Sequence, residues 1–159
     1  MGRLKLLLDT NVVVDFLHER EPHYRKTRLL MLAGRVGEFD LWITSSQVTD
    51  LVYILSDGGK RSELPRVLEQ LRGLRTFVNV YAVGDREVDR ALATLWKDPE
   101  DALIFEAALA MKADAIVTRN QKDFEKSSIK VFDCTGLFAY LEEEKGLVYD
   151  FVPMEKTEP

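Results

Sequence analysis

Acidic residues at the ends of apolar runs are the first candidates for chemistry in this chain. Asp9 directly follows the apolar run LKLLL, and Asn120 and Asp123 lie in TRNQKD, directly after AIV. Asp101 closes the segment DPED, which precedes the long apolar stretch ALIFEAALAM. Hard divalent cations such as Mg²⁺ and Mn²⁺ prefer oxygen ligands of this kind. With one Cys and two His, the chain has no grouping suited to zinc.

Each of these positions also has a structural interpretation, which the sequence leaves open. Asp9 can cap the helix that follows it, and Asp98 before Pro99 resembles the start of another helix. Asn120 and Asp123 are three residues apart, a spacing that a capping arrangement also explains. Taken singly, each residue is more often a cap than a metal ligand.

Asp50 is an acid that helix capping does not explain. It is the only charged residue between Asp40 and Asp57, and it lies within VTDLVYIL, which is mostly apolar. A carboxylate among apolar neighbours is costly unless it is paired, hydrogen-bonded or bound to a cation. A functional role is therefore at least as well supported as a structural one.

Short apolar runs alternate with amphipathic stretches, a pattern that predicts an α/β fold. We expect strands at 4–8, 40–44, 77–83, 114–118 and 129–133. We expect helices at 11–19, 23–36, 45–55, 62–74, 85–96, 99–112 and 135–144. Because the strands are nearly all apolar, they should form a parallel sheet covered on both faces. Ligands bind at the carboxyl ends of such strands, so the acids should meet there.

Composition indicates one folded domain, expected over 1–150 with a C-terminal tail at 151–159. The chain has 159 residues, of which 46% are hydrophobic and 31% charged, and this excludes a disordered chain. The single cysteine, Cys134, excludes an internal disulfide. The N-terminal apolar run is too short for a secretory signal or a membrane span, so we expect a cytoplasmic protein with no membrane partner.

The net charge alone argues against a nucleic-acid partner, but bound metal weakens that objection. The chain carries 22 basic and 27 acidic residues, a formal charge of −5. Two divalent cations would bring −5 to −1, and the ions themselves attract phosphate. Arg119, Lys60, Arg61 and Lys122 are candidate phosphate contacts, although ordinary solvated charge is the simpler explanation for each of them.

Clustered acids with divalent cations would activate water for attack on a phosphodiester, as in two-metal nucleases. The competing reaction is phosphoryl transfer to Asp9, because an apolar strand ending in Asp also begins haloacid-dehalogenase-like phosphatases and receiver domains. Those phosphatases have a second Asp two residues later, where this chain has Asn11. We therefore rank the phosphatase below the nuclease.

Three segments of the chain resemble PIN domains: LLLDTNVVVDFL, ITSSQVTDLVYIL and DALIFEAALAMKADAIVTRNQKDF. The resemblance spans residues 4 to about 133 and looks closest to VapC-like toxins of toxin–antitoxin operons. It implies an α/β/α sandwich with a central parallel five-stranded sheet. It also implies dependence on Mg²⁺ or Mn²⁺ and endonucleolytic cleavage of RNA.

The resemblance assigns roles to five residues as catalytic and metal-binding groups. Asp9 matches the first acid of the family, Asp101 the third, and Asp50 stands at the second, where Glu is common. Asn120 occupies the fourth position, where the family often has Asp, and Asp123 would supply the missing charge. These departures leave room for an alternative, a PIN-fold binding module without catalytic activity.

The same resemblance implies two protein partners. One is a small cognate antitoxin, and the other is a second copy of the chain in a homodimer. Candidate dimer surfaces are the helices within 22–36 and 45–75, which carry apolar residues beyond one face, including Tyr53 and Ile54.

Overall fold

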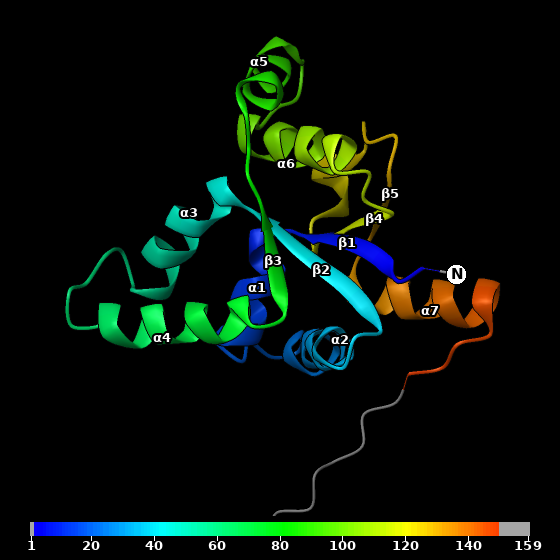
Figure 1. The fold of residues 1–159 in the computed structure, drawn as a ribbon, viewed down its shortest axis with the longest axis horizontal. Helices are drawn as coiled ribbons and strands as arrows, with labels where there is room; N and C mark the ends of the chain where they lie inside the picture. Colours follow the sequence, from blue (N-terminus) through cyan, green and yellow to red (C-terminus); the bar gives the residue numbers. More distant parts are fainter. Residues whose placement is uncertain (1, 150–159) are drawn as a thin grey trace, which may run out of the picture.

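The computed structural model describes residues 2–149, which alternate between strands and helices as predicted (Figure 1). The strands are β1 (Leu4–Leu8), β2 (Phe39–Thr44), β3 (Val78–Tyr81), β4 (Ala115–Val117) and β5 (Lys130–Phe132). The helices are α1 (Thr10–Leu17), α2 (Tyr24–Arg35), α3 (Ser45–Leu55), α4 (Leu64–Arg75), α5 (Asp85–Ala93), α6 (Pro99–Ala110) and α7 (Cys134–Lys145). A short 3₁₀ helix, η1 (Gln121–Phe124), follows β4.

The five strands form one sheet in the order β3-β2-β1-β4-β5, and every pairing is parallel. The central strand is β1, in which Leu6 lies opposite Leu41 of β2 and Ala115 of β4. Because all strands run the same way, the residues that follow β1, β2 and β4 emerge at one edge of the sheet.

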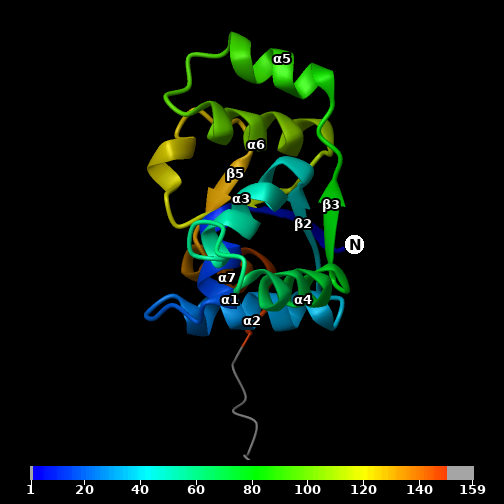
Figure 2. The same cartoon turned by 90° about the vertical axis from the view of Figure 1, so that its left-hand side faces the viewer.

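Helices cover both faces of the sheet, which confirms the predicted α/β/α sandwich. Successive residues of β1 point to opposite faces, so Leu6 and Leu8 pack in one core and Leu7 in another. The first core packs against α1 to α4 and α7, and the second against α6. Figures 1 and 2 show α5 lying over α6, on the side of α6 away from the sheet.

The element predictions hold except near element ends. Helix α5 ends at Ala93 rather than at residue 96, and the hydroxyl of Thr94 donates to Ala91 O at 2.8 Å there. Strand β3 ends at Tyr81, two residues earlier than expected, and η1 was not predicted. The predicted tail at 151–159 lies outside the described residues.

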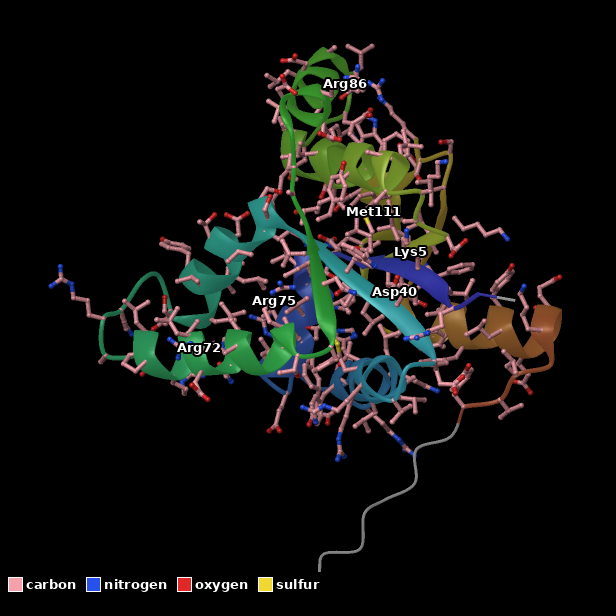
Figure 3. All side chains as sticks on the ribbon, viewed as in Figure 1. Lys5, Asp40, Arg72, Arg75, Arg86 and Met111 are labelled. Carbon is pink, nitrogen blue, oxygen red and sulfur yellow. The ribbon has the colours of Figure 1, made fainter. Side chains whose placement is uncertain are left out.

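The amino end of the sheet is held to the second helical layer by Lys5. Its Nζ donates to Met111 O at 3.1 Å, and Figure 3 shows both side chains between β1 and α6. Across residues 2–149, no helix combines the length and apolar character needed to cross a membrane.

Candidate active site

A cavity of about 280 Å³ opens at the carboxyl end of the sheet. Five acidic side chains line it, together with two amides and one guanidinium. They are Asp9, Asp98, Glu100, Asp101 and Asp123, with Asn11, Asn120 and Arg20. These residues follow β1, open α6 and follow β4, so parallel pairing brings together segments that are far apart in the sequence.

Asp9 is fixed in orientation by three hydrogen bonds. The backbone N–H of Thr10 donates to Oδ1 at 2.7 Å, so Asp9 does cap α1 as the sequence allowed. The hydroxyl of Thr118 donates to Oδ2 at 2.7 Å, and the amide of Asn11 donates to the same oxygen at 3.3 Å. With 7% of its surface exposed, Asp9 lies at the inner wall of the cavity.

Thr118 connects the ends of the two neighbouring strands β1 and β4. It is fully buried, donates to Asp9 and accepts the backbone N–H of Asn120 at 3.0 Å. This role of Thr118 was not predicted from the sequence. Its position directly after AIV was the available signal, because the first residue past a buried parallel strand reaches the ligand-binding edge.

The start of α6 contributes three acids. Asp98 caps the helix, accepting the backbone N–H of Glu100 at 2.9 Å, and Pro99 occupies the first turn. Capping explains Asp98, whereas Asp101 lies past the cap and lines the cavity. The positive end of the helix dipole favours these negative charges at its N-terminus.

Asn120 and Asp123 reach the cavity from the turn around η1. Asn120 precedes η1 but its side chain makes no capping hydrogen bond, so the capping interpretation is wrong for that amide. The backbone N–H of Asp123 donates to Asn120 O at 3.0 Å, which fixes the separation of the two residues. Both side chains line the cavity.

Asp50 lies outside the cavity lining but beside one of its acids. It is partly buried on α3 and close enough to Glu100 for its charge to act on that carboxyl. Burial raises the pKa of Glu100, and the charge of Asp50 raises it further. Glu100 was not singled out from the sequence, although it lies in the DPED segment.

The crowding of acids shows in their proton affinities. Burial raises the pKa of Asp101 to about 7, and the charges of Asp9 and Asp98 add to the effect. Burial also raises the pKa of Asp9, against the hydrogen bonds from Thr118 and Thr10, which lower it. A bound cation would favour the charged forms of these carboxyls.

The donor set fits a hard divalent cation that keeps part of its water shell. Carboxylates and one amide oxygen are the available ligands, and the sole cysteine is buried and lines a different cavity. Within residues 2–149, no three Asp, Glu, His or Cys side chains are placed so that they could hold a metal ion by themselves. Mg²⁺ is commonly held through one or two carboxylates and several waters, and such binding needs no closed cage.

Arg119, a candidate phosphate contact, is instead engaged inside the protein. Its Nε and Nη2 donate to the two carboxylate oxygens of Asp15 at 2.5 and 3.2 Å, and Asp15 is completely buried. The backbone N–H of Arg119 also donates to Asn11 Oδ1 at 3.2 Å. The ion pair between Arg119 and Asp15 therefore holds the turn that contains Asn120 against α1.

Sequence comparison gives two matches. A family model described as PIN domain matches residues 5–122. The chain is also 26% identical over 137 residues to a protein named Ribonuclease VapC1 from Aquifex aeolicus (strain VF5), covering 82% of this chain and 91% of that protein.

Structure comparison gives the same fold. FitAcB from Neisseria gonorrhoeae superposes with a TM-score of 0.64 at 15% identity, over 82% of this chain and 98% of that one. DNA-bound VapBC from Salmonella typhimurium superposes with a TM-score of 0.61 at 23% identity, over the same shares of the two chains. The family model covers most of the chain and the described fold agrees with it, so this chain belongs to the PIN domain family.

Proposed function

We propose that this chain is a divalent-metal-dependent endoribonuclease and the toxin of a VapC-type toxin–antitoxin pair. The observation that carries the proposal is the convergence of Asp9, Asp101 and Asp123 on one cavity, with the pKa of Asp9 and of Asp101 raised. Membership of the PIN domain family and similarity to Ribonuclease VapC1 support the same reaction class.

The carboxylates of Asp9, Asp101 and Asp123 and the amide oxygen of Asn120 would hold Mg²⁺ or Mn²⁺. When bound, the cation activates a water and neutralises charge on the phosphodiester. The charged form of each carboxylate is stabilised by the ion, which offsets the burial and the neighbouring negative charges that raise the pKa of Asp101.

Thr118 and Asn11 act as positioning residues for Asp9. Both donate to Asp9 Oδ2 and so fix the orientation of the carboxylate. The lone pairs that remain for a cation therefore point in a direction set by the protein. This arrangement also disfavours the phosphatase alternative. Asn11 donates to Asp9 and carries no acidic proton with which to assist a leaving group.

Asp50 acts through Glu100 in this proposal. Glu100 lines the cavity and Asp50 lies against it, so the second acid of the site is a pair of residues from α3 and α6. Two adjacent carboxyls share a proton or a cation more readily than either binds one alone.

The expected partners are RNA, a cognate antitoxin and a second copy of this chain, in the cytoplasm. The structural neighbours include VapBC complexes, which supports an antitoxin partner. Tyr53 and Ile54 on α3 are 63% and 38% exposed, and Ile54 borders the acidic cavity. An antitoxin that covers these residues would also cover the site. Helix α5 exposes Leu92 at 72%, which makes it a further candidate surface for the homodimer.

The test is cleavage of a mixed single-stranded RNA pool by the purified protein. We expect cleavage with Mg²⁺ or Mn²⁺, none in EDTA, and none by Asp9→Asn. The matched control is Asp89→Asn, which removes one exposed acid from α5 and should cleave at the wild-type rate.

Each outcome has a distinct meaning. Cleavage that survives in EDTA or in Asp9→Asn would refute this site. If wild-type protein that is folded and binds Mn²⁺ cleaves no RNA, the binding-module alternative replaces the nuclease. A phosphoryl group trapped on Asp9 would restore the phosphatase.

A further inference from the structure

A second cavity, of about 380 Å³, adjoins the acidic cavity and shares three of its acids. The shared residues are Asp98, Asp101 and Asp123. The remaining lining comes from the segment before α6 and from the turn that contains η1. These residues are Trp96, Lys97, Lys122, Glu125 and Lys126. We call this second cavity the lysine groove.

The lysine groove is built on a fixed aromatic support. Trp96 stacks on Phe105 with ring centroids 5.0 Å apart, and it meets Phe124 edge-on at 5.7 Å. Phe124 is 1% exposed, so this contact anchors Trp96 to the core. Lys126 Nζ donates to Leu95 O at 2.8 Å, which joins the two segments across the groove.

The groove carries charges of both signs. Its lining contains the three shared aspartates and Glu125 together with Lys97, Lys122 and Lys126. Lys97 and Lys122 are exposed, and neither forms an ion pair with any carboxylate among the described residues. Uncommitted lysines next to a cation-binding site attract a group that is itself negative, such as a backbone phosphate.

We propose that the lysine groove holds the nucleotide next to the scissile phosphate of a single-stranded RNA. Lys97 and Lys122 bind its phosphate, and Trp96 contacts its base. The inference rests on the proposed nuclease function, because it needs the scissile phosphate to lie at the neighbouring acids. A base contacts an indole only when it is unpaired, so the groove selects single-stranded over double-stranded RNA.

The test measures binding without cleavage, in the Asp9→Asn background. A fluorescently labelled single-stranded RNA is titrated by anisotropy across a series of salt concentrations. Adding Lys97→Ala with Lys122→Ala should weaken binding about tenfold. It should also reduce the salt slope by about 0.7, the value for one phosphate that is no longer neutralised. Lys97→Arg with Lys122→Arg should restore both values, because it retains the charge.

Two further variants test whether the loss of binding comes from the groove itself or from the lower overall positive charge of the protein. Lys130→Ala with Lys145→Ala removes the same charge at the opposite end of the sheet and should leave affinity and slope unchanged. Trp96→Phe keeps an aromatic ring on Phe105 and should weaken binding about threefold with no change of slope. Circular dichroism checks that each variant is folded.

The proposal would be overturned if the groove variant and its distant control showed the same dependence of affinity on salt concentration. It would also be overturned if the protein bound an RNA duplex as tightly as single-stranded RNA. Failure of the nuclease function would be seen separately, because wild-type protein would then cleave no RNA while the lysine effects on binding persisted.

Discussion

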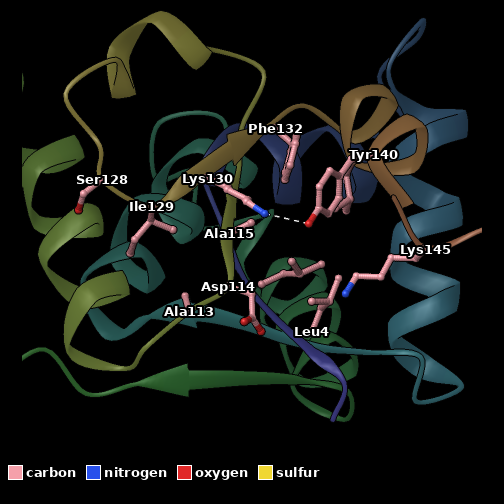
Figure 4. Close-up of a pocket in the computed structure, with 12 residues that line it drawn as sticks. Leu4, Ala113, Asp114, Ala115, Ser128, Ile129, Lys130, Phe132, Tyr140 and Lys145 are labelled. Atoms are coloured by element: carbon pink, nitrogen blue, oxygen red, sulfur yellow. Dashed lines mark hydrogen bonds between the residues drawn. The ribbon is translucent and has the colours of Figure 1, made fainter. Parts of the chain in front are cut away.

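A cavity lies at each end of the parallel sheet in this protein. The amino-end cavity has a volume of about 460 Å³, against about 280 Å³ for the acidic cavity at the carboxyl end. Its lining includes Leu6, Ala115 and Leu137, which are almost completely buried. Lys130 and Tyr140 also line it, and their side chains meet in Figure 4.

Two polar side chains of the amino-end cavity are paired with neighbours. Lys130 Nζ donates to Tyr140 Oη at 2.8 Å, and Asp114 Oδ2 accepts the backbone N–H of Lys5 at 2.7 Å. At the carboxyl end, by contrast, burial raises the pKa of Asp9 and of Asp101, and the charges of neighbouring carboxylates raise both further. Cavity size therefore does not identify the proposed active site. The acidic cavity is identified by carboxylates whose charge the protein does not compensate.

The largest expected difference between the two ends is in catalysis. Asp101→Asn should lower kcat/KM for RNA cleavage at least about 1,000-fold, because under the proposed function it removes a charged ligand of the cation. Asp114→Asn at the amino end should stay within about twofold of wild type, since an amide oxygen can still accept the Lys5 N–H. Comparable losses in the two variants would remove the distinction between the cavities.

The next largest effect is on stability. Arg119→Ala leaves the buried carboxylate of Asp15 unpaired and should lower the free energy of unfolding by about 3 kcal/mol. The measurement is urea denaturation at pH 7. Lys130→Ala, which breaks an exposed contact at the amino end, should leave the midpoint unchanged. If Arg119→Ala also left it unchanged, the Asp15 pair would not hold the turn of Asn120 in place.

A smaller effect is the pH dependence of stability in metal-free protein. The pKa of Asp101 rises from 3.8 to about 7 on folding, so between these values the native state binds a proton that the unfolded state releases. The free energy of unfolding should therefore fall as pH rises from about 4.5 to 8. Solvent screening of this partly buried group limits the change to about 1–2 kcal/mol.

Matched variants isolate this contribution from other titrating groups. Asp101→Asn should flatten the profile by that amount, and saturating Mg²⁺ should flatten it in wild type because the ion favours the charged carboxyl. Asp114→Asn should keep the wild-type slope. If the free energy of unfolding rose with pH more steeply in wild type than in Asp101→Asn, the predicted direction of the pH dependence would be wrong.

The fold could be predicted from local pattern, and the exceptions have local causes. Apolar runs such as LKLLL and the helical spacing of 45–55 mark β1 and α3 with the observed bounds. The predicted end of α5 was three residues late, since Leu95 and Trp96 continue an apolar helical pattern. Trp96 instead leaves the helix to stack on Phe105, a tertiary contact that spacing along the chain does not encode.

The candidate site was predictable where a residue follows a strand or opens a helix. Asp9, Asp101 and Asn120 satisfy that rule, and all three line the acidic cavity. Thr118 and Glu100 also satisfy the rule, but position along the chain does not tell what these two side chains do. The hydroxyl of Thr118 matters because β1 and β4 are neighbours, and Glu100 matters because it meets Asp50 from another helix. Both depend on which elements are adjacent in space.

The smallest expected effect concerns Asp50, the one predicted metal-site residue that does not line the cavity. Asp50→Asn should lower kcat/KM about tenfold, less than Asp101→Asn, because it acts through Glu100. Glu100→Gln should produce a similar loss, and the double variant should lose little more than either single one, since the two carboxyls work as a unit. Additive losses would mean that Asp50 reaches the reacting phosphate independently, and the acidic cluster would then extend beyond the cavity to α3.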